Sequence, residues 1–467
     1  MKKKLFFIGT VLSLSFSSFA GGLLTNTNQS VHFTRNPARD ASTSIDAVYT
    51  NPAGLSLLSH DGFHFSFTNQ SAFQTRTITS TNVPFAGFGG SETKKFKGEA
   101  SAPIIPSIQA AYKVGNWVLS GSFAISGGGG KATFNNGLPS FESNLAKLPA
   151  IIQQVGQAVP GGITADKYSV DSYMRGSSFI FGTQLGGTYK INEYFSAYGG
   201  FRLNIVNNSY EGHLRDLKSN PTSAALGMTG TMISTEPILD MAIANTTDES
   251  TLAGLMLLKK ASGDGVYLDC SQTGWGISPI IGFNFNYDKL NIGMKYEFLT
   301  NLNVENKTKR DDTGMFRDGV NTPHDIPALF TLGLSYQIIP KLQASVGYHR
   351  FFDSGATMDG DKQKDAGSTN EYLAGLEYRI DKMFLVSAGG QITRYGVGDI
   401  YQRDLSYACD SYTIGFGGEV TISPKVKLNL GYFWTTYSDY TKTYEGGTKD
   451  VFSRTNKVFG AGVDFSF

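Results

Sequence analysis

The sequence has little of several features that mark common protein classes. It contains only two cysteines, and its formal net charge is +1, which argues against a nucleic-acid partner. No apolar run after the first twenty residues approaches the length of a membrane-spanning helix, so a helical membrane protein is not expected. No nucleophile motif marks a hydrolase, and the six histidines are scattered. We therefore predict no enzyme activity, no catalytic residues, no metal site and no cofactor.

Glycine and aromatic residues are abundant. There are 55 Gly, 33 Phe and 23 Tyr, while overall hydrophobic content is a moderate 40%. A transmembrane β-barrel has this composition, because its lumen is polar and aromatic girdles mark both membrane interfaces.

The first twenty residues have the order of a secretory signal peptide. Three lysines at positions 2–4 precede an apolar stretch over residues 5–14, and Ser18-Phe19-Ala20 supplies small residues for cleavage. The apolar stretch is too short for a membrane anchor, which needs about 20 residues. We predict a signal peptide over residues 1–20 and a mature chain from Gly21.

From residue 61 onward, apolar and polar residues alternate in repeated segments. The second face of these segments carries charges such as Lys295 and Glu377, which belong in a wet lumen rather than on a lipid face. The last segment ends on an aromatic residue and resembles the C-terminal signal that barrel-assembly machinery recognises. Its apolar face is formed by Phe459, Ala461, Val463, Phe465 and Phe467.

Short turns alternate with long loops along the same region. Tight turns at Gly115-Asn116, Asp288-Lys289 and Pro424-Lys425, among others, separate polar loops such as 127–176 and 213–272. This layout predicts an all-β fold, a transmembrane antiparallel barrel of about fourteen strands over residues 61–467.

Two of the long loops are expected to be partly helical. In loop 127–176, apolar residues recur at helical spacing, and in loop 213–272 residues 224–260 are rich in Leu, Ile, Met and Ala. Such apolar faces pack on the barrel rim, on the other loop or on a greasy ligand. The candidate ligand-binding residues here are Phe141, Leu145, Leu148, Ile152, Val155 and Leu255.

The two cysteines both fall near strand ends on the expected exterior side. An even count in an oxidising compartment favours a disulfide between Cys270 and Cys409, with two free thiols as the alternative.

Residues 21–60 do not have a strand pattern, since they contain Asn-Pro-Ala units at residues 36–38 and 51–53. The run from Asp40 to Leu55, which includes Asn51-Pro52-Ala53-Gly54, resembles the N-terminal hatch of the FadL family of outer-membrane long-chain fatty acid transporters. The resemblance extends to chain length, strand count and long, partly helical loops. It implies a plug formed by residues 21–60 inside the barrel lumen.

The resemblance also implies a function and a set of site residues. Family members capture hydrophobic molecules at apolar loops, pass them to a pocket near the hatch N-terminus and release them sideways through a kink in the third strand. Here these positions are Gly21, Gly22 and Leu23 for the ligand, and Ser126, Gly127 and Gly128 for the lateral gate. A flexible start to the long loop is the alternative for these last three residues.

The implied partners are a long-chain fatty acid or other hydrophobic small molecule, outer-membrane lipid and lipopolysaccharide, and the barrel-assembly machinery. The implied location is the outer membrane of a Gram-negative bacterium. A general diffusion porin and an outer-membrane lipid-active enzyme are the alternative functions.

Overall fold

The computed structural model describes residues 22–467. The signal peptide predicted over residues 1–20 and the ligand role predicted for Gly21 lie outside the described residues. The fold is a closed antiparallel barrel of fourteen strands with a helical segment at its N-terminal end, which confirms the predicted fold class.

The barrel wall is one continuous sheet of eighteen strand segments, four of which extend or flank a neighbour. The seventh strand is split into β10 and β11, the eighth into β12 and β13, and β19 extends β18, while the short β8 pairs with the outer end of β5. The segments are β1 (Gly62–Thr81), β2 (Thr93–Val114), β3 (Trp117–Phe134), β4 (Tyr168–Lys190), β5 (Phe195–Ser219), β8 (Ile233–Ser234), β9 (Val266–Tyr287), β10 (Leu290–Glu297), β11 (Asn303–Asp311), β12 (Asn321–Pro323), β13 (Leu329–Ile339), β14 (Leu342–Phe351), β15 (Thr369–Arg379), β16 (Phe384–Arg394), β17 (Ser411–Ser423), β18 (Val426–Tyr437), β19 (Tyr440–Thr443) and β20 (Lys449–Ser466).

Pairing of β1 with β20 closes the ring, from His64 opposite Ser466 to Thr81 opposite Lys449. Closure leaves no free sheet edge, and a strand structure in lipid requires this because nothing there can satisfy an exposed backbone N–H or C=O.

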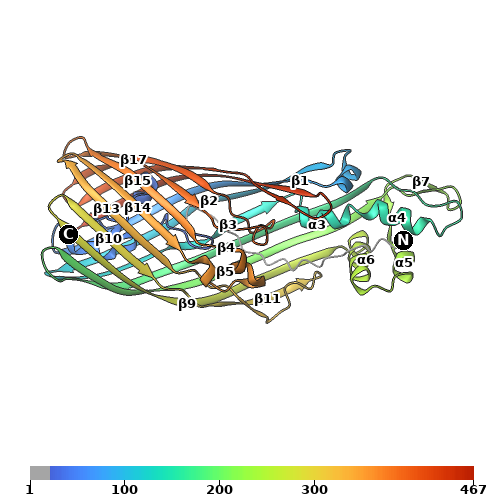
Figure 1. The fold of residues 1–467 in the computed structure, drawn as a ribbon, viewed down its shortest axis with the longest axis horizontal. Coiled ribbons are helices and arrows are strands. Elements are labelled where there is room, and N and C mark those ends of the chain that lie inside the picture. The colour runs from blue at the N-terminus through green and yellow to red at the C-terminus, as the bar shows by residue number, and fades with distance from the viewer. Residues whose placement is uncertain (1–21) are drawn as a thin grey trace.

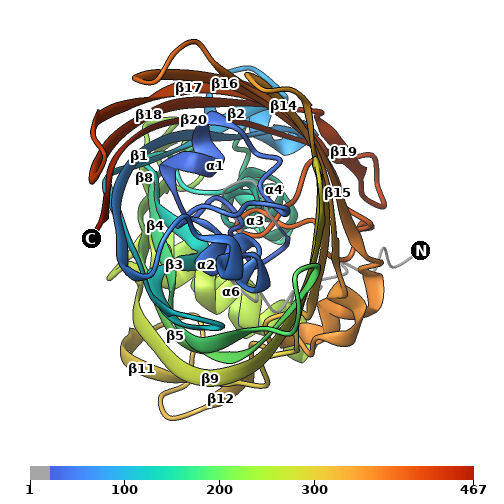
Figure 2. The same cartoon turned by 90° about the vertical axis from the view of Figure 1, so that its left-hand side faces the viewer.

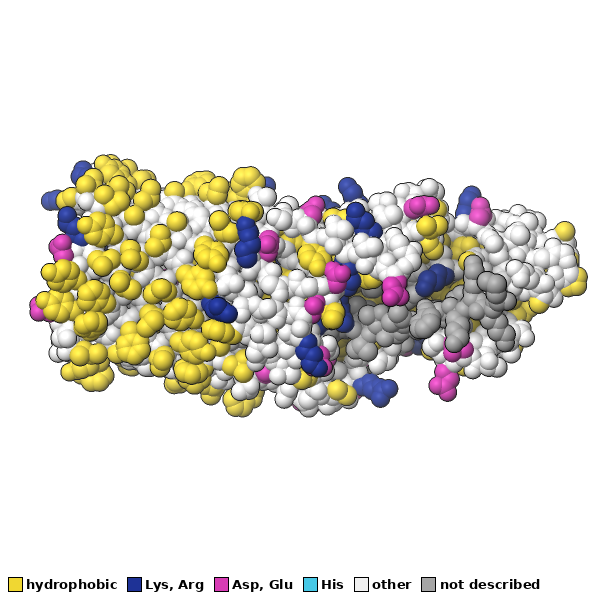
Figure 3. Space-filling view, viewed as in Figure 1, with side chains coloured by type: hydrophobic (Ala, Val, Ile, Leu, Met, Phe, Trp, Pro, Cys, Tyr) yellow, Lys and Arg dark blue, Asp and Glu magenta, His cyan; other side chains and the backbone are white. Residues whose placement is uncertain are grey.

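The outer surface is apolar over the half of the barrel that carries the short turns (Figure 3). Alternate residues of each strand face outward there, as in β18, where Leu428, Leu430 and Trp434 are exposed. The other half carries charged and polar side chains and bears the long loops. Strands β1 to β5 and β9 reach far into this second half (Figure 1). The strands are therefore longer, and the loops expected at residues 127–176 and 213–272 are shorter, than the sequence predicts.

The helices lie in two places. Inside the ring of strands, near the short-turn end, lies the hatch: the described part of residues 21–60, with α1, α2 and η1 (Figure 2). At the opposite end α3 to α6 gather between the extended strands (Figure 1). The bounds are α1 (Val31–Arg35), α2 (Ala47–Thr50), η1 (Pro52–Leu57), η2 (Val83–Phe88), α3 (Pro139–Leu145), α4 (Leu148–Gly156), α5 (Glu236–Ala244), α6 (Glu249–Ser262), η3 (Asp353–Gly355) and η4 (Asp359–Asp365). Within residues 22–467, no helix is long and apolar enough to cross a membrane.

Candidate transport site

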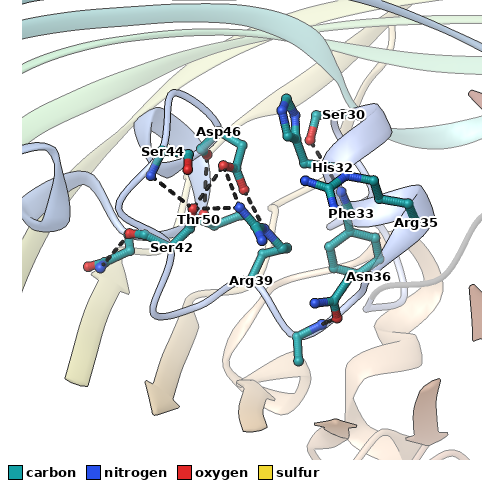
Figure 4. Close-up of polar contacts among 12 residues, drawn as sticks. Ser30, His32, Phe33, Arg35, Asn36, Arg39, Ser42, Ser44, Asp46 and Thr50 are labelled. Atoms are coloured by element: carbon teal, nitrogen blue, oxygen red, sulfur yellow. Dashed lines mark hydrogen bonds and ion pairs between the residues drawn. The ribbon is translucent and has the colours of Figure 1, made fainter. Parts of the chain in front are cut away.

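The hatch is held together by a compact polar network (Figure 4). Ser30 caps α1, and its hydroxyl accepts a hydrogen bond from the Phe33 amide. The Arg39 guanidinium donates two hydrogen bonds to the Asp46 carboxylate, at 2.8 and 2.9 Å, and a third to the Ser42 hydroxyl at 2.8 Å. Two planar groups joined in this way fix both position and orientation, so the network shapes a segment that has little regular structure.

Ion pairs attach the hatch to the barrel wall at several points. Arg35 Nη1 and Arg39 Nη1 both donate to Glu377 of β15, at 2.6 and 2.9 Å. Asp40 contacts the His349 ring of β14 at 2.8 Å. The His32 ring also contacts the Asp464 carboxylate of β20, with 2.9 Å between His32 Nε2 and Asp464 Oδ2.

The inward-facing charges singled out from the sequence, Lys295 and Glu377, therefore meet the hatch rather than a wet lumen. Lys295 is 1% exposed, and its ammonium donates to the Tyr49 carbonyl at 2.8 Å. Glu377 is likewise shielded, with a side chain 11% exposed. The expectation of a water-filled lumen at these positions is corrected, because the plug supplies the partners that water would have supplied.

The Asn-Pro-Ala-Gly element forms a tight joint against the wall. Asn51 donates to the Ser42 carbonyl at 3.0 Å and to Asn284 at 2.7 Å, and Pro52 begins the helix η1. A side chain at Gly54 would lie 2.3 Å from the Asn51 amide nitrogen, so only glycine fits there. The Ala53 carbonyl accepts a hydrogen bond from Ser196 at 2.7 Å. The contacts at Asn51, Pro52, Ala53 and Gly54 thus explain why these residue types occur in the motif.

The N-terminal end of the hatch runs to β3. The Leu24 carbonyl accepts from the Gly128 amide at 3.2 Å, and the Asn26 amide donates to the Ser126 carbonyl at 2.7 Å. Leu23 and Leu24 are 0% and 5% exposed. They belong to a buried group that we call the N-terminal cluster, which comprises Leu23, Leu24, Ile180, Val206, Leu302, Val304, Ile326, Ala356, Met358, Ala366, Tyr401 and Ala408.

Gly22 precedes this segment and lies against the Phe351 ring. A Cβ at Gly22 would be 2.5 Å from Phe351 Cδ1, so the chain can pass there only as glycine. The structure therefore brings Gly22, Leu23 and the gate candidates of β3 to one part of the lumen.

The pairing of β2 with β3 is interrupted along the barrel wall. Their ladder breaks between the pair Ala100–Ala132 and the pair Ile108–Phe123. On the other side of β3, the register with β4 shifts at Gly127 and again before Gly130. We call this interruption the wall gap. It lies at the three residues that the sequence marks as gate candidates, Ser126, Gly127 and Gly128.

Backbone chemistry disfavours pairing of β2 with β3 in the wall gap, and on the β3 side the hatch takes its place through a bridge between Thr25 and Gly127. Gly128 has φ of 90°, and a Cβ at Gly127 would lie 2.1 Å from the Leu24 carbonyl oxygen. Opposite, β2 carries Pro103 and Pro106, which lack the N–H groups a ladder needs. Sequence analysis missed these two prolines, although proline inside an alternating segment is a usable signal.

Apolar side chains line the interior beside the wall gap. Ile105 of β2 and Phe33 of the hatch are buried together there, and Ala102 and Ile125 pack against them at partial exposure. We call this set the gap cluster; its buried members are Phe33, Ala38, Ala72, Ile105, Leu373, Phe433 and Val458.

The helical loops pack on each other at the long-loop end. Leu145, Leu148 and Ile152 are 0% exposed and Leu255 is 4% exposed, while Phe141 and Val155 are partly buried. All six lie in or against one extended cluster, the cap core, which also holds Ile238 and Leu239 of α5 and Tyr407 of the loop before β17. The apolar helical faces thus cover one another.

The loop between β16 and β17, residues 395–410, folds into the lumen. Its Tyr401 and Ala408 belong to the N-terminal cluster, while Leu405 and Tyr407 belong to the cap core. The loop therefore lies between the two clusters. Asp404 anchors it by accepting a hydrogen bond from the Ser140 amide at 2.8 Å, and burial raises the pKa of Asp404 to about 6.

The expected disulfide is not formed. Cys270 and Cys409 are both buried free thiols. The Cys270 sulfur accepts a hydrogen bond from Thr308 at 3.3 Å, and the Cys409 thiol donates to the Phe452 carbonyl at 3.6 Å. Both behave as small apolar residues of the cap core. Over residues 22–467, no group of three or more His, Cys, Asp and Glu side chains is placed to hold a metal ion.

Comparison with known proteins gives likeness in structure but not in sequence. No protein-family model matches the chain, and no curated protein sequence does. The chain is similar to the crystal structure of a Pseudomonas aeruginosa FadL homologue, with 13% identity and a TM-score of 0.63, covering 97% of this chain and 100% of that one. It is also similar to the Pseudomonas putida toluene transporter TodX, with 12% identity, a TM-score of 0.54 and coverage of 97% and 96%. For the Ralstonia pickettii toluene transporter TbuX the values are 14%, 0.50, and 91% and 94%. These matches confirm the resemblance to FadL-type barrels at the level of the fold.

Proposed function

We propose, starting from the FadL-type fold of this chain, that it is a passive transporter of hydrophobic molecules in the outer membrane of a Gram-negative bacterium. The observation that carries the proposal is the wall gap between β2 and β3, which is lined inside by the gap cluster and reached by the N-terminal end of the hatch. A hydrophilic pore does not need an apolar interruption in the pairing of its wall strands.

The proposed route has three stages. A molecule enters between the helices of the cap core, passes the inward loop 395–410 to the N-terminal cluster, and leaves through the wall gap into the surrounding lipid. The FadL homologue and the toluene transporters with this fold support a hydrophobic cargo. We include long-chain fatty acids and aromatic hydrocarbons among the candidates.

Physical chemistry favours a sideways exit. Releasing an alkyl chain into water costs about 0.8 kcal/mol per CH₂ group, and delivery into lipid avoids this cost. The hatch also fills the lumen at the short-turn end, where Arg35, Asp40 and Lys295 are all engaged in contacts between plug and wall. This arrangement speaks against the general diffusion porin. The likeness to a FadL homologue and to toluene transporters speaks against the lipid-active enzyme.

Two measurements on the purified protein test the proposal. Native mass spectrometry from detergent should detect a co-purified lipid or fatty acid, and the protein in planar bilayers should show little steady current. A large ohmic conductance with no bound hydrophobic molecule would support the porin instead. Uptake of a radiolabelled fatty acid or toluene by cells that lack their own hydrophobic channel supplies the functional readout.

A further inference from the structure

Two arginines face each other across the seam where the barrel closes. Arg76 of β1 and Arg454 of β20 are direct partners in the strand register, and the next inward-facing pair is Gln74 with Asn456. All four side chains point into the lumen and are 0–6% exposed. We call these four residues the arginine seam.

The arginine seam contains hydrogen-bond donors with nothing to donate to. Arg454 Nη2 donates to Gln74 Oε1 at 3.1 Å, which uses the acceptor of that amide. Arg454 Nε, Gln74 Nε2 and both amide atoms of Asn456 have no hydrogen-bond partner. Buried polar groups are normally satisfied, so three donor-bearing side chains left open in one patch need an explanation.

The charges of the seam pose the same question. Like charges directly opposite on paired strands repel, and a buried charge is normally matched by an opposite one. Arg76 lies beside Tyr407, with its Cζ 4.5 Å from the centre of that ring. The ring nearest Arg454 does not neutralise its charge: Arg454 Cζ lies 5.2 Å from the centre of the Tyr437 ring. The ion pairs found among the described residues include none at Arg454. An anion is the complement that would satisfy the charge and the open donors together.

The position of the seam fits a head group with an apolar tail. On the outer side of the seam, the next inward pair is Ile78 with Phe452, in the cap core. On the other side it is Ala72 with Val458, in the gap cluster beside the wall gap. Four residues of strand separate Arg76 from Ala72, roughly 13 Å at 3.3 Å per residue. A polar band thus separates two apolar clusters along one column of the wall.

We propose that the arginine seam binds the anionic head group of the cargo, while the apolar tail extends along β1 and β20 toward the wall gap. The inference rests on the proposed transport function and narrows its substrate class to hydrophobic acids, with a carboxylate as the simplest head group. A guanidinium suits a carboxylate because its planar N–H groups match two oxygens, and the Gln74 and Asn456 amides add further donors. Neutral hydrocarbons would leave the seam unsatisfied.

The test compares probes that share a tail and differ in the head. Binding of radiolabelled oleate, oleyl alcohol and toluene is measured on the full-length protein in detergent. Wild type should bind oleate at least roughly tenfold tighter than oleyl alcohol, a difference of about 1.4 kcal/mol. R454Q and R76Q should lose most of this preference while the affinity for oleyl alcohol stays the same, and R454K should retain part of it.

A matched control and a stability measurement separate recognition from structure. R175Q removes a guanidinium that is exposed and paired with Glu211 at 3.4 Å, so the preference for oleate should not change. Ligand-free R454Q should unfold at the same temperature as wild type or higher, because it loses a buried charge that has no counter-charge. A lower unfolding temperature with an unchanged ratio of oleate to alcohol affinity would make Arg454 structural and overturn the proposal.

The outcomes also separate this inference from the proposed function. Equal binding of oleate and oleyl alcohol to wild type, with toluene bound, would mean that water satisfies the seam; transport of hydrophobic molecules would stand and the head-group site would fail. Displacement of oleate by millimolar inorganic phosphate without loss of oleyl alcohol binding would assign the anion site to a small free anion instead. Failure of all three probes to bind would overturn both.

Discussion

Replacing Glu377 with Gln should loosen the hatch without unfolding the barrel. The Glu377 carboxylate receives hydrogen bonds from two hatch arginines, Arg35 at 2.6 Å and Arg39 at 2.9 Å, and its side chain is only 11% exposed. Gln keeps the shape and one acceptor oxygen but removes the negative charge. In the variant, Arg39 still forms its ion pair with Asp46. Arg35 is left with Glu419 as its remaining acidic neighbour, at 3.9 Å.

The magnitude follows from the burial of this group. Removing one partner of a buried ion pair costs about 3–5 kcal/mol, because the remaining charge stays desolvated. If the cost falls on the seated hatch alone, the ratio of displaced to seated hatch rises by on the order of a hundredfold or more. The barrel strands keep their ladders, so the folded band in heat-modifiability gels should remain.

Current across planar lipid bilayers measures the displaced state directly. E377Q should open far more often than wild type, and the control E211Q should behave as wild type, because Glu211 and Arg175 form an exposed pair of the kind that contributes little. The double variant R35Q/E377Q should open less often than E377Q, since it removes a charge that the single variant leaves stranded. Identical open frequencies for E377Q and E211Q would refute the view that this pair seats the hatch.

Three further predictions concern the route and its loop. Gly127→Val should reduce uptake of hydrophobic probes, because its side chain would collide with the Leu24 carbonyl oxygen and expel the N-terminal segment from the wall gap. Leu24→Asn should weaken binding of co-purified lipid in native mass spectrometry, since an unsatisfied amide in an apolar cluster costs roughly 1–3 kcal/mol. The loop 395–410 should become more sensitive to trypsin as pH rises through about 6 in wild type but not in Asp404→Asn. The folded pKa of Asp404 is raised, so its contribution to stability is complete below its ordinary value of 3.8 and is lost as pH rises through about 6.

Each of these three predictions has a control: the first two use the same type of substitution at a position away from the proposed route, and the third compares wild type with the variant. Gly199→Val introduces the same side chain where nothing lies within 4 Å, and it should transport normally. Leu226→Asn alters a leucine that is already 49% exposed, so lipid binding should persist. Cleavage of the loop is compared between wild type and Asp404→Asn at each pH, so the protease's own pH dependence cancels. Equal effects in variant and control, or parallel pH curves, would contradict the assignments.

The outward face of this barrel can be predicted from sequence because lipid imposes a simple rule on it. Residues such as Leu430 and Trp434 alternate with polar neighbours, and a period of two residues is enough to place them. The hatch and the gate candidates were predicted differently, from a motif at residues 51–54 and a run of glycines from residue 127. The disulfide prediction failed because an even cysteine count carries no distance information.

The inward face resists prediction because its partners are distant in the chain. No residue near Glu377 in the sequence indicates that it pairs with Arg35, which lies 342 residues away. Arg76 lies opposite Arg454 only because the first and last strands pair to close the ring. These contacts follow from closure and from how far the hatch reaches, and neither is a local property of the sequence. The same argument separates two kinds of lumen charge. Charges such as Lys295 and Glu377 have partners in the hatch and serve to seat it, whereas the open donors of the arginine seam have none in the hatch. In a lumen already filled by its own plug, polar groups left unsatisfied are the positions where a cargo can be recognised.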